Sequence, residues 1–185
     1  LILIHGGIGP SINDVNSIAS ISRPITNFND ERVSDLLWSD PSDTISMFIP
    51  SNRGTGNIFG TTALNSFLSN SKLKLLIRGH QCIENGCQSI NDGKVITVFS
   101  ASNYCGITNN KAGVLIIDPS LSSLKQNSLQ KNNSIQKANS LTNKNSRIKQ
   151  EIFFISSYQI KIFDPLPSFA RSDVVFVKSD SDYAF

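Results

Sequence analysis

The sequence has few cysteines and histidines, the residues that cross-link small folds through disulfides or metal ions. It has three cysteines and two histidines among 185 residues, and also only one methionine and one tryptophan. The cysteines, Cys82, Cys87 and Cys105, are odd in number and form no CxxC pair, which argues against a disulfide framework. A zinc site built from these thiols is a weaker alternative to three ordinary buried or half-buried thiols. We therefore expect a reducing location, cytoplasmic and/or nuclear.

Long apolar runs are also missing. None approaches the roughly 18–20 residues that cross a bilayer, and no basic segment precedes Leu1–Ile4 as it would in a secretory signal. We therefore expect no membrane partner. The hydrophobic content of 39% suits a globular domain with a real core. Because the chain begins at Leu1, inside an apparent strand and without methionine, we also expect it to be part of a longer protein.

Acidic residues are absent from one tract, residues 119–150, which holds six basic side chains and is rich in Ser, Asn, Lys and Gln. Outside it, 11 basic residues face 14 acidic ones, so the net charge of +3 comes from this tract alone. A nucleic-acid partner is not expected, because such proteins cluster basic charge on a folded face. The tract itself buries too little apolar surface to order, and we predict a disordered insertion, inert or regulated through its serines.

The remaining sequence alternates strand-like and helix-like segments. Short helices are expected over Ile12–Ile18 with Ser11 as N-cap, over Asp30–Trp38, and after a Thr61 or Thr62 cap, while residues 42–60 resemble a loop. The expected strands are Leu1–Ile4, Leu73–Ile77, Lys94–Phe99, Ala112–Ile117 and a single strand over Ile152–Phe163. This pattern predicts a mixed α/β fold, with a layered sheet and helices packed outside it.

The polar residues of interest follow these strands. Each histidine, His5 and His80, ends an apolar run and adjoins glycine, which is a common way to aim a metal ligand from a rigid scaffold. Arg53 lies in the glycine-rich segment Ser51–Gly60, where its planar fork could bind a phosphate. Tyr104 follows another strand and offers a hydroxyl. Together these groups are typical of a phosphoryl-transfer site.

The order of the motifs resembles one family. His5-Gly6-Gly7-Ile8-Gly9-Pro10, Arg23-Pro24, Asp35–Pro41, Arg53-Gly54, Phe59-Gly60, Ile77–Gln81, Phe99–Gly106 and Asn109–Gly113 resemble, in sequence, the phosphoprotein phosphatases, the metal-dependent serine/threonine phosphatases of the type 1, 2A and calcineurin group. The resemblance covers residues 1–118, as the C-terminal half of the catalytic domain. Residues 119–150 would then be an insertion, 151–163 the last strand, and 164–185 a tail of uncertain role.

The resemblance implies a metallophosphoesterase-like β-sandwich flanked by helices, of four layers, present only as its C-terminal half. It implies two divalent metal ions of the Mn, Fe or Zn type, phosphoprotein substrates and regulatory subunits. By residue, it implies His5 and His80 as ligands of one metal, Arg53 as the phosphate-binding arginine, and Tyr104 and Asp40 as residues of the active-site cleft. Gly79 and Ser102 replace the alanine and proline common in the family, and little effect is expected.

The family's GDxHG, GDxVDRG and GNHE motifs do not occur in the 185 residues. They carry the other metal ligands, the general-acid histidine and a second phosphate-binding arginine. The sequence therefore predicts a serine/threonine phosphatase represented by a chain that is inactive alone. Two alternatives remain: a catalytically inactive phosphatase-like module that binds regulators or phosphoproteins, and, less favoured, another metallophosphoesterase such as a nucleotidase or nuclease.

Overall fold

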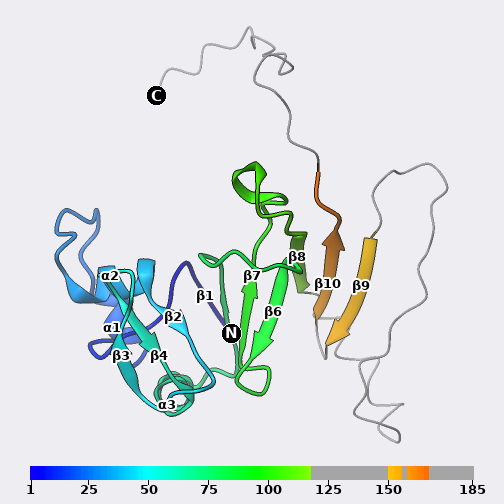
Figure 1. Cartoon of the computed structure of the whole chain (residues 1–185). Coiled ribbons are helices and arrows are strands. Elements are labelled where there is room, and N and C mark those ends of the chain that lie inside the picture. The colour runs from blue at the N-terminus through cyan, green and yellow to red at the C-terminus, as the bar shows by residue number, and fades with distance from the viewer. Residues whose placement is uncertain (118–149, 156–157, 167–185) are drawn as a thin grey trace, which may run out of the picture.

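The computed structural model describes residues 1–117, 150–155 and 158–166 (Figure 1). Three sheets organise these residues, with strand orders β1-β5-β7-β6, β8-β10-β9 and β2-β4-β3. The strands are β1 (Ile2–Ile4), β2 (Asp40–Pro41), β3 (Phe48–Pro50), β4 (Asn57–Phe59), β5 (Leu76–Arg78), β6 (Cys87–Ile90), β7 (Val95–Val98), β8 (Ala112–Ile117), β9 (Gln150–Ile155) and β10 (Tyr158–Phe163). The helices are α1 (Val15–Ala19), α2 (Glu31–Trp38), α3 (Thr61–Asn70) and the 3-10 turn η1 (Tyr104–Gly106).

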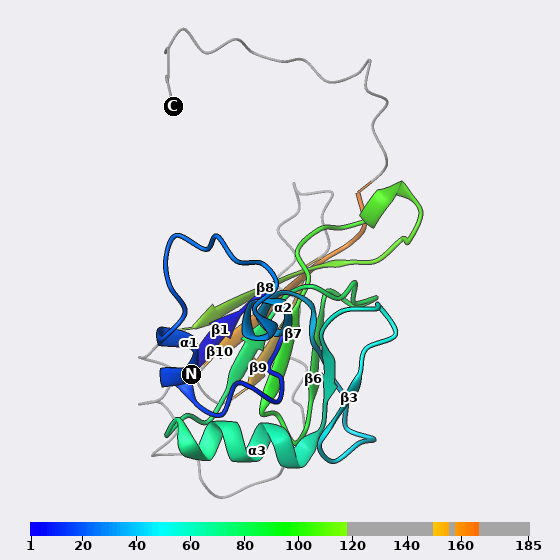
Figure 2. The same cartoon turned by 90° about the vertical axis from the view of Figure 1, so that its left-hand side faces the viewer.

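The two middle strands of the central sheet, β5 and β7, are buried on both faces because their residues alternate between two cores. Leu76 of β5 and Val95 of β7 face the larger core, which contains Leu64 and Phe67 of α3. Their chain neighbours, including Ile77, belong to a second core on the opposite face, against the sheet of β8 and β10. Near-continuous apolar runs are what such doubly covered strands require. Figure 2 shows α3 running across the central strands.

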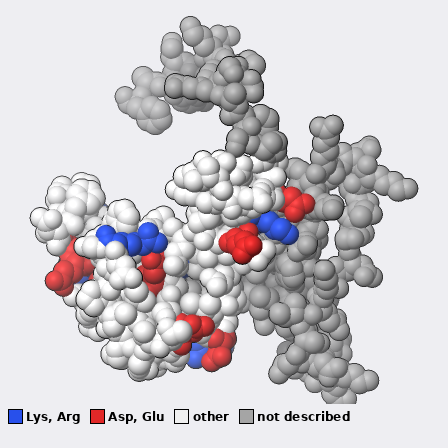
Figure 3. Space-filling model, viewed as in Figure 1, with Lys and Arg blue, Asp and Glu red and all other residues white. Residues whose placement is uncertain are grey.

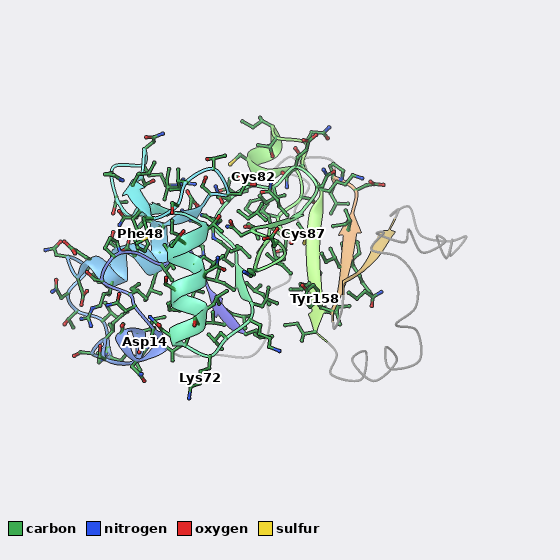
Figure 4. All side chains as sticks on the ribbon, turned by 90° about the horizontal axis from the view of Figure 1, so that it is seen from below. Asp14, Phe48, Lys72, Cys82, Cys87 and Tyr158 are labelled. Carbon is green, nitrogen blue, oxygen red and sulfur yellow. The ribbon has the colours of Figure 1, made fainter. Side chains whose placement is uncertain are left out.

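The two cores give the layered sandwich that the sequence predicted. Phe48 packs on the core of α3, whereas Tyr158 packs on the second core, and Figure 4 shows them on opposite sides of the molecule. Helices, central sheet and second sheet are three layers of the expected four among the residues that the structure describes. The fold is mixed α/β, as expected.

Several predicted elements need correction. The predicted loop 42–60 contains β3 and β4, which pair antiparallel, with Phe48 opposite Phe59. The predicted single strand Ile152–Phe163 is two antiparallel strands, β9 and β10, with Ile155 opposite Tyr158. Apolar positions 155 and 158 stand three apart, which breaks the period of two that one strand needs. Strand β6 was not predicted.

The helix caps also differ from prediction. The side chain of Asp14, not Ser11, caps α1 by accepting a hydrogen bond from the amide of Ser17. Gly60, rather than Thr61 or Thr62, is the N-cap residue of α3 and supplies no side-chain bond. Helix α2 begins after Asp30 and ends at Trp38, as expected. The predicted insertion lies outside the described residues except for Gln150, which belongs to β9.

One hydrogen bond and one ion pair hold the residues that directly follow β10. Asn103 Nδ2 donates to the carbonyl oxygen of Leu166 at 3.1 Å, and Lys111 pairs with Asp164 at 3.7 Å. The rest of the predicted tail, residues 167–185, lies outside the described residues. None of the described helices is long and apolar enough to cross a membrane.

Candidate phosphatase half-site

The two histidines meet at one edge of the central sheet. Strands β1 and β5 are adjacent and parallel, with Ile4 opposite Arg78, so the residues that follow them emerge side by side. His80 Nδ1 lies 3.2 Å from His5 Nε2, and the ring centroids are 5.0 Å apart. The Gly79 amide also donates to the carbonyl of His5 at 3.1 Å, which ties the two turns together. The structure thus joins two imidazoles that are 75 residues apart in sequence.

His80 is held in an unusual conformation. Its φ of 70° lies in the left-handed region, which non-glycine residues adopt only where their surroundings enforce it. The Trp38 ring packs edge-on against the imidazole, with centroids 5.5 Å apart. Burial lowers the pKa of His80, although the nearby Asp40 carboxylate opposes this. A lowered pKa favours the neutral ring, which is the form that ligates metal.

Asp40 lies between two arginines. Its Oδ1 accepts from Arg78 Nη2 at 2.8 Å, and its Oδ2 accepts from Arg53 Nε at 2.8 Å. Asp40 is 8% exposed and the side chain of Arg78 is fully buried, whereas that of Arg53 is 40% exposed. Burial lowers the pKa of Arg78, while Asp40 raises it. One carboxylate between two guanidinium groups leaves a local charge of +1, which favours an anion.

Arg53 is carried by the turn between β3 and β4. Two glycines of this turn, Gly54 and Gly56, have φ of 79° and 70°, a conformation that favours glycine. A side chain at Gly56 would also lie 2.9 Å from the backbone of Trp38, so the turn needs a glycine to approach α2. Neither Nη1 nor Nη2 of Arg53 has a partner among the described residues. The guanidinium therefore presents two free donors beside the histidines.

Tyr104 lies in a different loop. Its ring packs against Phe99 with centroids 5.2 Å apart, and its amide donates to Asn110 Oδ1 at 2.8 Å. The residue is 47% exposed. No contact recorded within the described ranges joins Tyr104 to His5, His80, Arg53 or Asp40. The structure thus brings together four of the five predicted site residues and leaves the fifth, Tyr104, on a different loop.

Comparison with known proteins shows what this part of the chain resembles. A family model described as calcineurin-like phosphoesterase matches residues 1–84, the span that holds His5, Asp40, Arg53 and His80. Residues 1–84 of this chain are thus similar to a calcineurin-like phosphoesterase domain.

The relatives that align with the chain include serine/threonine phosphatases. Over 125 residues the chain is 42% identical to the serine/threonine-protein phosphatase BSL2 of Arabidopsis thaliana, and the match covers 65% of this chain and 12% of that protein. It is 36% identical, also over 125 residues, to the serine/threonine-protein phosphatase 6 catalytic subunit of Caenorhabditis elegans, covering 68% and 38%. The chain thus spans well under half the length of either relative.

A solved structure agrees in fold. It is a protein serine/threonine phosphatase from Saccharomyces cerevisiae with similarity to human phosphatase PP5. The match has a TM-score of 0.55 and 36% identity, and it covers 61% of this chain and 35% of the yeast chain. The aligned part of the chain is therefore similar to this phosphatase in both sequence and fold.

The spacing of the histidine pair, His5 and His80, fits one metal ion. Two imidazole nitrogens that bind the same zinc at about 2.0–2.1 Å stand about 2.9–3.4 Å apart in tetrahedral or octahedral geometry, and His5 Nε2 and His80 Nδ1 are 3.2 Å apart. His80 Nε2 is buried with no described partner, so Trp38 orients this ring where a hydrogen-bond acceptor usually would. The described residues hold no group of three or more candidate ligands, so the pair is an incomplete site.

The cysteines contribute nothing to this site. All three are free, with Cys82 and Cys105 exposed and Cys87 half-buried. Burial raises the pKa of Cys87 to about 11, which keeps it a thiol. Figure 4 shows Cys82 and Cys87 near β8, apart from one another. The weak alternative of a cysteine zinc site has no support among the described residues.

The prediction from sequence missed Arg78 as a site residue. The signal was present, because an arginine that ends the apolar run Leu75–Ile77 must bury its charge against a partner. Its guanidinium donates to the carbonyl of Gly6, to Gln81 and to Asp40, and it links the two strand ends to β2. Across the described part of the face in Figure 3, positive and negative groups lie in small mixed sets, and no broad basic surface forms.

Proposed function

We propose that this chain supplies one half of the active site of a serine/threonine protein phosphatase, which hydrolyses phosphoserine and phosphothreonine with two divalent metal ions. The observation that carries the proposal is the pair His5 Nε2 and His80 Nδ1, 3.2 Å apart, beside the free donors of Arg53. Imidazoles for a metal and a guanidinium fork for a phosphate are the two components that metal-assisted phosphoryl transfer needs.

Each residue has a separate task in this proposal. When bound, two ions of the Mn, Fe or Zn type would supply an activated water that attacks phosphorus and displaces the serine or threonine oxygen. His5 and His80 would hold one of these ions through Nε2 and Nδ1, respectively. Arg53 binds two phosphate oxygens through Nη1 and Nη2 and offsets their charge. Tyr104 and Asp40 line the cleft beside the phosphate.

We also propose that the 185-residue chain is inactive by itself. Two neutral imidazoles do not offset the charge of two divalent ions, which prefer carboxylate oxygens. Asp40 does not fill that need, because both of its oxygens are engaged by arginines. The residues that the family uses for the second metal and as general acid do not occur in this sequence.

A chimera tests the proposal. The matching 125-residue segment of the C. elegans phosphatase 6 catalytic subunit is replaced by the corresponding segment of this chain, and hydrolysis of a phosphoserine peptide is measured with Mn²⁺. We expect activity, and we expect Arg53→Ala or His80→Ala to reduce it by at least about 100-fold, as loss of a charge-stabilising group does in other enzymes. Lys74→Ala, a charge loss on an exposed residue, is the matched control. A folded chimera in which Arg53→Ala retains full activity contradicts the role of Arg53.

The alternative is a phosphatase-like module that binds phosphoproteins or regulators without hydrolysis. It is favoured by the combination of an open arginine fork with an incomplete ligand set among the described residues. The same chimera separates the two functions, because a binding module would retain phosphopeptide affinity but show no turnover.

The partners we propose are phosphoprotein substrates and regulatory subunits, without nucleic acid or membrane. The proposed location is cytoplasmic and/or nuclear. Three free cysteines support a reducing setting.

A further inference from the structure

Asp40 and Arg78 form a buried pair behind the exposed Arg53. Asp40 Oδ1 receives Nη2 of Arg78, and only Oδ2 faces Arg53. Arg53 donates to Asp40 through Nε alone, so its Nη1 and Nη2 have no partner among the described residues. The three side chains come from a turn, from β2 and from β5, and their order is fixed by these two bonds of 2.8 Å.

This order decides whether Arg53 can bind an anion. A carboxylate with both oxygens free binds a guanidinium bidentately, through two parallel N–H···O bonds. Such a pair between Asp40 and Arg53 would use one of the terminal nitrogens that a phosphate needs. In the structure Oδ1 of Asp40 is paired with Arg78, and Asp40 accepts one bond from Arg53, through Oδ2. With Arg78 on the other oxygen, the terminal nitrogens Nη1 and Nη2 of Arg53 remain free to bind a phosphate.

Arg78 is well suited to this task because burial and several hydrogen bonds hold its guanidinium in place. Its side chain is fully buried, and it also donates to the carbonyls of Gly6 and Ser39 and to Gln81. Ser39 is itself fixed, since its hydroxyl donates to Asp35 at 2.7 Å and accepts from the Asn57 amide at 2.8 Å. This network connects the histidine turns to the strand that follows Arg53.

We propose that Asp40 and Arg78 are positioning residues, which hold Arg53 by Nε and thereby direct its two terminal nitrogens to a substrate phosphate. This inference rests on the proposed function, in which Arg53 binds that phosphate. The two arginines that bind Asp40 thus have different tasks. The buried Arg78 holds one oxygen of the carboxylate, and the exposed Arg53 binds the substrate phosphate. Asp40 therefore assists anion binding despite its negative charge.

The direction in which Asp40→Asn changes phosphate affinity separates this positioning role from a purely electrostatic effect of the Asp40 charge. Inorganic phosphate is titrated into the full 185-residue chain, and affinity is measured by calorimetry for wild type and Asp40→Asn. If Asp40 acted only through its charge, its removal would tighten anion binding. We expect the opposite, a loss of about tenfold, because Arg53 loses a charge-assisted hydrogen bond that orients it. Asp43→Asn, the same charge change at an exposed neighbour, should leave affinity unchanged or slightly tighter.

A wild-type measurement covers the case in which Asp40→Asn does not fold. In a ¹⁵N spectrum of the arginine side chains, phosphate should move the Nη signals of Arg53 while its Nε–H, held by Asp40, stays in place. Movement of Nε–H equal to that of Nη overturns the inference, as does tighter binding by a folded Asp40→Asn. If wild type and Arg53→Ala bind phosphate equally, the proposed function of Arg53 fails, and the positioning role fails with it.

Discussion

Two Gly→Ala substitutions beside the two histidines should have opposite effects on stability. At Gly7, an added Cβ would lie 2.2 Å from Phe59 Cε1 and 2.9 Å from the carbonyl oxygen of Ser39. Phe59 is completely buried and cannot give way without disturbing the core. We expect Gly7→Ala to lower the free energy of unfolding by about 2–3 kcal/mol, within the range of overpacked cores.

Gly79 is the matched control. An added Cβ there would meet nothing closer than the Val98 carbonyl oxygen at 3.7 Å and His5 Nδ1 at 3.9 Å, both ordinary contacts. Its φ is outside the left-handed region, so alanine adopts the same backbone. We expect Gly79→Ala to raise the free energy of unfolding by about 0.5 kcal/mol, because alanine restricts the unfolded chain. This agrees with the small effect expected from the sequence.

Urea unfolding followed by tryptophan fluorescence and circular dichroism measures both values. With a slope of about 1–3 kcal/mol per molar urea, the two midpoints should differ by about 1–3 M. Midpoints that coincide, or a Gly79→Ala protein less stable than Gly7→Ala, would refute the packing of the His5-Gly6-Gly7 turn against β4 on which the site depends.

Two further predictions concern the core and the thiols. Leu64→Ala should destabilise the chain by about 2–5 kcal/mol in the same urea experiment, because Leu64 is fully buried between α3 and the central sheet; a loss below about 1 kcal/mol would contradict that packing. Iodoacetamide at pH 8 should modify the exposed Cys82 and Cys105 at least about tenfold faster than Cys87, since burial raises the pKa of Cys87 to about 11 and thiolate is the reactive form; equal rates in mass spectrometry would place Cys87 at the surface.

The sequence was most informative where chemistry and strand pattern coincide. His5 and His80 each end an apolar run, and parallel pairing of β1 with β5 is enough to bring them together. Helix α2 was also predictable, because Asp30 caps it and its apolar residues follow helical spacing. These features depend on local signals that a single sequence carries.

The missed features depend on contacts between distant segments. Strands β3 and β4 are three residues each and surround a turn rich in Ser and Gly, so their composition is that of a loop. The bond between Asp40 and Arg78 joins residues 38 apart, and no spacing rule indicates it. The β9–β10 hairpin was visible only as a break in alternation between Ile155 and Tyr158.

The most direct test of the account is a Zn²⁺ titration of the chain, without a histidine tag, followed by imidazole ¹⁵N resonances. The predicted result is one Zn²⁺ per chain, with His5 Nε2 and His80 Nδ1 shifting together as the binding nitrogens and with binding lost in either His5→Ala or His80→Ala. Independent titration of the two rings, or binding through His80 Nε2, would contradict the central claim that these two histidines form one half of a shared metal site.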